Sequence, residues 1–232
     1  MMKTIYFTAI GLLLLTSSCL NDLDNYDAPN GGIYGTIIDD ATNKPVPLPV
    51  QGSTGVMINL TEQNTDATRS VDFYAKYDGT YANASVFNAD YTVKVNGPFV
   101  QKAEQTVKVS GQTKLDFRVV PYSRINATAQ VSGKVITITY SVEKTDPSFV
   151  VSEVYGLWNF APGVDNGTSN QAGTKTVSAA SGTIVFDLAA EKNYNKSNIQ
   201  KIAANGNKIY LRVGAKTNNA INYSEIITVQ MN

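Results

Sequence analysis

The sequence of 232 residues contains no histidine, one cysteine and one tryptophan. Without histidine it can form no imidazole-based catalytic triad, no histidine metal site and no pH switch that depends on imidazole. A single cysteine, Cys19, cannot form a disulfide within the chain, so stability must come from apolar cores. An excess of charge is also lacking, because 19 basic and 19 acidic residues give a net charge of 0. We therefore expect no nucleic acid partner, since such proteins carry a basic surface.

The first 19 residues have the pattern of a bacterial lipoprotein signal that ends at the cysteine. Lys3 supplies a positive charge, residues 5–15 are apolar, and the segment ends in Leu15-Thr16-Ser17-Ser18-Cys19, which resembles a lipobox. The apolar run is shorter than the stretch of about 20 residues that spans a bilayer. We expect residues 1–18 to be a signal peptide and Cys19 to carry the lipid. The alternative is an ordinary secretory signal with an incidental cysteine.

Residues 19–31 are typical of a tether. Three aspartates lie in a polar stretch that is closed by Pro29, and this composition favours a solvated linker. A calcium loop is the alternative, although the spacing of the aspartates lacks the glycine and the distal glutamate that such a loop requires. No cluster of lysine and arginine is present for anionic lipid, so acyl chains would provide membrane attachment. The acidic residues resemble the surface-export signal of Bacteroidetes lipoproteins, which implies a lipid-anchored protein of the outer membrane that faces outward.

Residues 32–120 alternate apolar and polar side chains with a period of two, which predicts strands. Turn residues such as Asp78-Gly79 separate them, and the expected strands cover residues 33–38, 56–60, 71–75, 80–87, 90–95, 105–109 and 114–119. Many short strands with turn residues between them favour an all-β sandwich.

This segment resembles the carboxypeptidase-regulatory-like module. The resemblance is carried by Gly35-Thr36-Ile37-Ile38-Asp39, Thr42-Asn43-Lys44-Pro45-Val46, Asp78-Gly79-Thr80-Tyr81 and Tyr91-Thr92-Val93. It implies a transthyretin-like sandwich with a structural role and no catalytic residues. The stretch Pro47–Ser53 is longer than the usual connection in this module, and we expect it to form a protruding loop.

Pro121 marks the boundary to a second set of strands, because proline ends a ladder. The expected strands cover residues 124–130, 134–142, 150–158, 175–177, 182–188, 208–215 and 222–230, with a short helix at 197–204 that begins at a Ser197 cap. Tyr210–Ala215 resembles strand F of fibronectin-III and immunoglobulin-like domains. The expected fold is all-β, with two tandem β-sandwich domains: transthyretin/carboxypeptidase-regulatory-like at 32–120, then immunoglobulin/fibronectin-III-like at 121–232.

The two halves in this order, behind a lipobox, resemble a Bacteroidetes outer-membrane lipoprotein family catalogued as a domain of unknown function. Asn96-Gly97-Pro98-Phe99 adds to the resemblance. Members tend to be encoded beside starch-utilisation-type transporters and their glycan-binding lipoproteins. The resemblance implies a cell-surface lipoprotein of a polysaccharide-utilisation system that needs no cofactor. Its expected partners are a polysaccharide or oligosaccharide and an outer-membrane transporter complex.

The candidate glycan-binding residues gather in the segment that holds the only tryptophan. Aromatic faces pack against the apolar faces of sugars, and amides and carboxylates bond sugar hydroxyls, so the candidates are Trp158, Asn159, Phe160, Asp165 and Asn166. The alternative for Trp158 is a place in the core, where sandwiches of this kind keep a tryptophan. A second candidate loop, 216–223, ends at Tyr223, and a purely structural hairpin is the alternative there.

Two other classes of function are open to this sequence. One is a structural or protein-interaction lipoprotein with no affinity for glycan. The other is a glycoside hydrolase, which needs two carboxylates at a defined separation, and Glu153 and Asp165 are the pair that flanks the aromatic segment. Most of the other acidic residues fall in turns or on outward strand positions, where solvated charge is the rule. We therefore expect a protein without catalytic activity and without a metal site.

Overall fold

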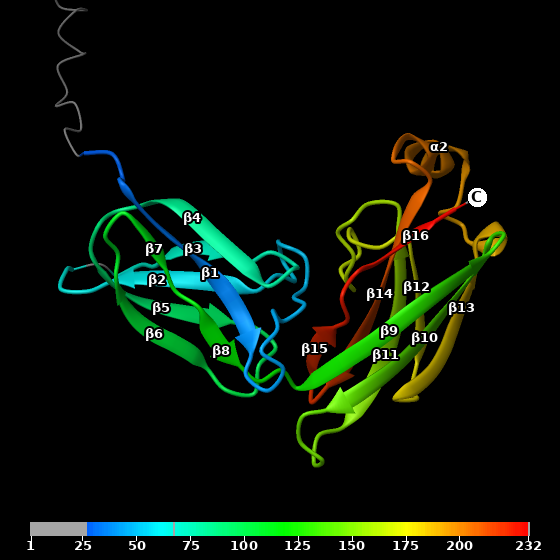
Figure 1. Cartoon of the computed structure of the whole chain (residues 1–232), viewed down its shortest axis with the longest axis horizontal. Coiled ribbons are helices and arrows are strands. Elements are labelled where there is room, and N and C mark those ends of the chain that lie inside the picture. Colours follow the sequence, from blue (N-terminus) through cyan, green and yellow to red (C-terminus); the bar gives the residue numbers. More distant parts are fainter. Residues whose placement is uncertain (1–26, 67, 232) are drawn as a thin grey trace, which may run out of the picture.

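The computed structural model describes residues 27–66 and 68–231, and it is all-β, as the sequence predicts (Figure 1). Its four sheets form two sandwiches, which we call the N-terminal sandwich (27–120) and the C-terminal sandwich (121–231). The predicted signal peptide, Cys19 and most of the predicted tether lie outside the described residues. In the described part of the chain, no helix has the length and apolar character needed to cross a membrane.

Eight strands build the N-terminal sandwich: β1 (Gly31–Asp39), β2 (Met57–Glu62), β3 (Val71–Tyr74), β4 (Thr80–Val86), β5 (Asp90–Asn96), β6 (Ala103–Lys108), β7 (Gln112–Lys114) and β8 (Phe117–Val119). One sheet has the order β4-β1-β7, and β8 also pairs with β1. The facing sheet has the order β3-β2-β5-β6. Both β7 and β8 run parallel to β1, whereas the other pairs are antiparallel.

The core of the N-terminal sandwich follows from the two-residue period. Ile33 and Ile37 of β1 point inward and meet Val93 of β5, and all three are fully buried. Burial of each such side chain stabilises the fold by about 1.5–3 kcal/mol. The outward positions between them, such as Tyr34, are exposed.

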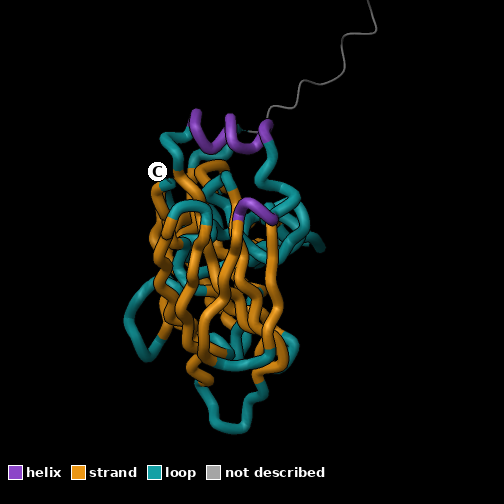
Figure 2. The backbone as a smooth tube through the Cα atoms, turned by 90° about the vertical axis from the view of Figure 1, so that its right-hand side faces the viewer, coloured by secondary structure: helices purple, strands orange, loops and turns teal. Residues whose placement is uncertain are grey.

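The C-terminal sandwich contains β9 (Ser123–Ser132), β10 (Val135–Lys144), β11 (Val151–Asn159), β12 (Gly173–Val177), β13 (Ser181–Asp187), β14 (Lys208–Thr217), β15 (Ala220–Tyr223) and β16 (Ile227–Gln230). Its sheets have the orders β13-β10-β9 and β12-β11-β14-β15, and β16 pairs with the other end of β14. A second core lies between them, built around Ile136, Trp158 and Leu211. Two short helices, η2 (Leu188–Ala190) and α2 (Lys196–Ala204), lie at one end of this sandwich (Figure 2).

The helix predicted at 197–204 is confirmed, but its cap differs from the prediction. The side chain of Asn195, not that of Ser197, accepts a hydrogen bond from the first turn, at 3.2 Å from the Asn198 amide. Asparagine and serine are equally good N-caps, so residue type alone does not distinguish a cap at Asn195 from one at Ser197. Only Ile202 is buried in this helix.

Two predicted strands are interrupted in the structure. The strand expected at 114–119 is split between β7 and β8, because the Asp116 carboxylate accepts the Thr36 amide at 2.9 Å in place of a ladder carbonyl. The hydroxyl of Tyr81 donates to the Leu115 carbonyl at the same break. The strand expected at 222–230 is split between β15 and β16, and this second break belongs to the junction of the two sandwiches.

Candidate functional site

An ion pair fastens the end of β1 to the start of β9. Arg124 donates from Nε to Asp39 Oδ2 at 2.5 Å and from Nη2 to Asp39 Oδ1 at 2.8 Å. Burial alone would raise the pKa of Asp39, but the hydrogen bonds from Arg124 and from the Ala41 amide outweigh it and hold that pKa below its ordinary value. The carboxylate is therefore charged at neutral pH and joins the two sandwiches through a bidentate contact.

A second contact is made by Asp165, in the loop after β11. Its side chain is fully buried, and its Oδ2 accepts from the Val50 amide at 2.8 Å and from Thr54 Oγ1 at 2.7 Å. Its Oδ1 accepts from the Gly167 amide at 2.7 Å and from Asn170 Nδ2 at 2.9 Å. The stretch predicted to protrude after Pro47 therefore packs against the C-terminal sandwich.

A buried arginine lies on β14, next to this contact. Arg212 donates from Nε to the Ser224 carbonyl at 2.7 Å and from Nη1 to the Val164 carbonyl at 3.0 Å. Its guanidinium lies 4.7 Å from the centroid of the Tyr223 ring. Burial lowers the pKa of Arg212 to about 10, against the opposing effects of Tyr223 and Asp165. The side chain remains a cation at neutral pH, and Asp165 is its nearby counter-charge.

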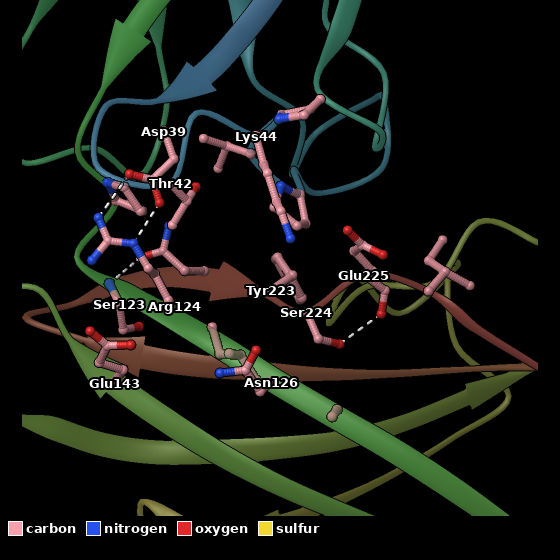
Figure 3. Close-up of a pocket in the computed structure, with 18 of the residues that line it drawn as sticks. Asp39, Thr42, Lys44, Ser123, Arg124, Asn126, Glu143, Tyr223, Ser224 and Glu225 are labelled. Atoms are coloured by element: carbon pink, nitrogen blue, oxygen red, sulfur yellow. Dashed lines mark hydrogen bonds and ion pairs between the residues drawn. The ribbon is translucent and has the colours of Figure 1, made fainter.

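A β-bulge interrupts the last strand beside Arg212. β15 and β16 both pair with β14, but their registers differ by one residue, so Glu225 and Ile226 together stand opposite Arg212. The Ser224 hydroxyl accepts from the Val213 amide at 3.1 Å and donates to the Glu225 carbonyl at 2.8 Å. Bulges re-aim side chains, and this one directs Glu225 out of the sheet toward the N-terminal sandwich (Figure 3).

A cleft of about 620 Å³ lies between the two sandwiches, and we call it the junction cleft. The loop after β1 forms one wall, and β9, β10 and the bulge form the other. Four polar side chains that line it make no hydrogen bond or ion pair with any other residue of 27–66 and 68–231: Lys44, Asn126, Glu143 and Glu225. Polar groups from both sandwiches are therefore open to a ligand in this cleft.

A smaller cleft of about 340 Å³ also lies at the junction, lined by Pro49, Pro98, Ile221 and Asn166 among others. Tyr223 borders both clefts. Burial raises the pKa of Tyr223 to about 12, so its hydroxyl stays protonated, and this hydroxyl accepts from the Asn166 amide at 3.2 Å. Tyr223, at the end of the second candidate loop, is the last residue of β15 and lies buried between the two clefts.

The two aromatic candidates pack on the core of the C-terminal sandwich. Trp158 is fully buried, with its ring centroid 6.4 Å from that of Tyr194, which agrees with the core alternative for this residue. Phe160 is half-buried against the same core, and the Lys201 ammonium lies 4.9 Å from its ring centroid. Neither ring lines one of the two clefts.

The polar candidates are distributed over three places. Asn159, the last residue of β11, is buried; it donates to the Gly163 carbonyl at 3.2 Å and accepts from the Phe160 amide at 2.8 Å. Asp165 lies at the contact between the sandwiches, and Asn166 lines the smaller cleft. The structure does not bring the five candidates together around one opening.

The two carboxylates considered for hydrolysis are engaged with different partners. Glu153 accepts from the Tyr155 hydroxyl at 2.6 Å and lies 3.4 Å from Lys216 Nζ. The hydrogen bond from Tyr155 lowers the pKa of Glu153, whereas a general acid requires a raised one. Among residues 27–66 and 68–231, no group of three or more acidic, cysteine or histidine side chains is placed to hold a metal ion.

The sequence analysis missed the four side chains of the junction cleft. One signal for them was present in the last strand. In the alternation Tyr223, Glu225, Ile227, Val229 a carboxylate occupies a position where its neighbours at the same spacing are apolar. A charge in phase with buried positions indicates either an ion pair or a bulge, and the structure has the bulge.

The N-terminal sandwich has the sequence pattern of a known family. Residues 31–120 match the family described as protein of unknown function (DUF3823), N-terminal domain. This similarity is confined to the N-terminal sandwich and covers less than half of the chain. The DUF3823 match begins with β1 and ends directly after β8. The matched residues therefore include Lys44 of the junction cleft but not the bulge at Glu225 and Ile226.

Solved structures resemble the chain over both sandwiches. A DUF3823 family protein from Parabacteroides merdae has 21% sequence identity and a TM-score of 0.72, covering 88% of this chain and 100% of that chain. A protein from Bacteroides uniformis, described as a "putative carbohydrate binding protein", has 24% identity and a TM-score of 0.69, with the same coverage. At identities this low, the structural similarity shows a common fold and no more. No curated protein sequence matches the chain.

Proposed function

We propose that the chain is a lipid-anchored cell-surface protein that binds saccharides without cleaving them, as an accessory of a polysaccharide-utilisation system. The observation that carries this proposal is the junction cleft, where the side chains of Lys44, Asn126, Glu143 and Glu225 make no hydrogen bond or ion pair with the described residues. Its volume of about 620 Å³ falls within the range of about 300–1,000 Å³ that is typical of small-molecule sites. Sugar hydroxyls both donate and accept hydrogen bonds, as this mixed lining requires.

The structural relatives support the proposal at the level of fold. The Bacteroides uniformis protein with the carbohydrate-binding description matches this chain over both sandwiches, so the two proteins share the arrangement that forms a junction. The DUF3823 relatives from Parabacteroides merdae and Bacteroides uniformis match over the same length.

The expected domain layout is part of the proposal. The C-terminal sandwich divides its strands as first, second and fifth against third, fourth, sixth and seventh, when β15 and β16 are taken as one interrupted strand. An immunoglobulin constant domain differs only in the sheet to which the fourth strand belongs. We therefore assign the C-terminal sandwich to the immunoglobulin-like class, and the sequence resemblance of residues 32–120 leads us to propose the transthyretin-like class for the N-terminal sandwich.

Binding is tested on the soluble chain from Asn21 with a panel of neutral and acidic oligosaccharides in calorimetric titrations. We expect saturable binding of at least one saccharide, because the four polar side chains of the lining have no hydrogen bond or ion pair that binding would break. Product analysis of the same mixtures by chromatography should show intact saccharide. Release of shorter sugars would favour the hydrolase alternative, and absence of binding across the panel would favour a structural or protein-interaction role.

The anchor is tested with Cys19→Ala. Since the thiol is the only site of lipid attachment that the signal offers, the variant should leave the membrane fraction or remain uncleaved. Immunoblots of membrane and soluble fractions, with metabolic labelling by a fatty acid, measure this. Ser18→Ala keeps a small residue before the cysteine and should behave as the wild type. A Cys19→Ala protein that stays processed and membrane-bound would exclude the lipoprotein assignment.

A further inference from the structure

We infer that the junction cleft selects uncharged saccharides over acidic ones, and that Lys44 and Glu225 make this selection from opposite walls. This inference rests on the proposed function, and it adds the class of saccharide and the residues that recognise it. It follows from the charges that face the cleft and from the way in which the bulge presents Glu225.

The ionisable groups around the cleft fall into paired and unpaired sets. Asp39 and Arg124 neutralise each other through two hydrogen bonds. Arg212, behind the bulge, has the buried carboxylate of Asp165 as its counter-charge. The groups that remain are one cation and two carboxylates, which are Lys44, Glu143 and Glu225. The cleft therefore presents a small excess of negative charge, which disfavours a ligand that carries carboxylate or sulfate groups.

Lys44 and Glu225 offer a hydrogen-bond donor and an acceptor on opposite walls of the cleft. Lys44 extends from the N-terminal sandwich toward the bulge that carries Glu225 (Figure 3), yet the two side chains form no ion pair. A sugar hydroxyl can donate to the carboxylate and accept from the ammonium at the same time. A uronate carboxylate could use only the ammonium and would be repelled by Glu143 and Glu225.

Apolar groups complete the lining. Pro47 on one wall and Ile226 and Ile227 on the other are half-buried and face the same space. Such surfaces can cover the C–H faces of a sugar ring while the polar groups bond its hydroxyls, which is the usual composition of a small-molecule site. The bulge supplies both kinds of group, because it turns Glu225 and Ile226 together toward the cleft.

The inference is tested by comparing each neutral disaccharide of a panel with its uronate counterpart, for example α-1,4-galactobiose with α-1,4-digalacturonate. The protein is the soluble chain from Asn21, and titration calorimetry gives the affinities. For any neutral disaccharide that binds, we expect its uronate form to bind about tenfold more weakly or worse, as one lost charged hydrogen bond would cause. Affinity for the neutral form should hardly change between low and high salt.

Substitutions at Lys44 and Glu225 test whether these residues bind the saccharide and select by charge. Lys44→Met should weaken binding of the neutral disaccharide about tenfold, since the charged donor is lost. Glu225→Gln keeps hydrogen-bonding groups but removes the charge, so it should narrow the difference between neutral and uronate forms. Lys134→Met and Asp90→Asn are the matched controls, because both side chains are exposed, unpaired within the described residues and outside the cleft.

The outcomes separate this inference from the proposed function. Binding of a saccharide that is unchanged in Lys44→Met and Glu225→Gln would overturn the site while leaving the function in place. A uronate form that binds as tightly as its neutral counterpart would overturn the selection by charge. Absence of binding to every saccharide would overturn the proposed function itself, and the inference with it.

Discussion

Asp165→Asn should lower the free energy of unfolding by about 3 kcal/mol, close to the cost of breaking a buried ion pair. Each oxygen of the Asp165 carboxylate accepts one backbone amide, from Val50 on one side and from Gly167 on the other. A backbone amide cannot become an acceptor, so the NH₂ group of an asparagine would face a donor in either orientation. The substitution would also leave Arg212 buried without its counter-charge. Urea denaturation followed by far-UV circular dichroism measures the change.

Asp90→Asn serves as the control for this prediction. The Asp90 carboxylate is exposed and makes no hydrogen bond or ion pair with the described residues. The variant should therefore change the free energy of unfolding by no more than about 0.5 kcal/mol. If Asp165→Asn were equally mild, the contact between the 47–54 loop and the loop after β11 would contribute little to stability. The pair of Asp39 and Arg124 and the hydrogen bond from Asn222 Nδ2 to the Pro98 carbonyl at 3.0 Å would then contribute more to holding the two sandwiches together.

Trp158→Ala should lower the free energy of unfolding by about 3–5 kcal/mol, because it leaves a large cavity in a packed core. The side chain is fully buried in the C-terminal sandwich, in contact with the ring of Tyr194. Its indole nitrogen is buried without a hydrogen-bond partner in the described structure, so the loss comes from packing and not from a broken hydrogen bond. Thermal and urea unfolding of the soluble chain measure it.

Trp158→Phe separates the contribution of ring packing from that of the indole nitrogen. It keeps an apolar ring and removes a donor that has no partner, so it should cost less than half as much as the alanine variant. A loss equal to that of Trp158→Ala would show that the indole nitrogen matters. Because the chain has one tryptophan, the tryptophan fluorescence of the wild type, excited selectively, reports this core, and its emission should shift to the red on unfolding.

Much of the fold could be predicted because the strands of both sandwiches alternate clearly. Ile33, Ile37 and Val93 are buried at the spacing that a half-buried strand requires. The failures occurred where a side chain replaces a ladder partner. Asp116 accepts the Thr36 amide between β7 and β8, and Ser224 accepts the Val213 amide at the bulge. A period of two in the sequence cannot show that a side chain takes the place of a backbone acceptor, because the donor belongs to a neighbouring strand.

The candidate site was harder to predict, because it is formed by residues from both sandwiches. Aromatic and amide composition singled out Trp158 to Asn166, but composition does not distinguish a core tryptophan from an exposed one. Asp165 is a similar case, since its four donors include Val50 and Thr54, which are more than a hundred residues away in the sequence. Lys44 carries no local signal at all. Its place in the cleft depends on the loop after β1 lying opposite Glu225, and only the fold determines this arrangement.

The course of β1 has a consequence for the reach of the molecule. β1 begins at Gly31, where the described chain enters the N-terminal sandwich, and ends at Asp39 in the contact with β9 (Figure 1). Nine residues of extended chain measure about 30 Å at about 3.3 Å each. If a lipid on Cys19 holds the protein, β1 would place the junction up to that distance from the point where the described chain enters the N-terminal sandwich. The N-terminal sandwich would then serve as a spacer, lifting the cleft to where a polymer outside the cell can enter it.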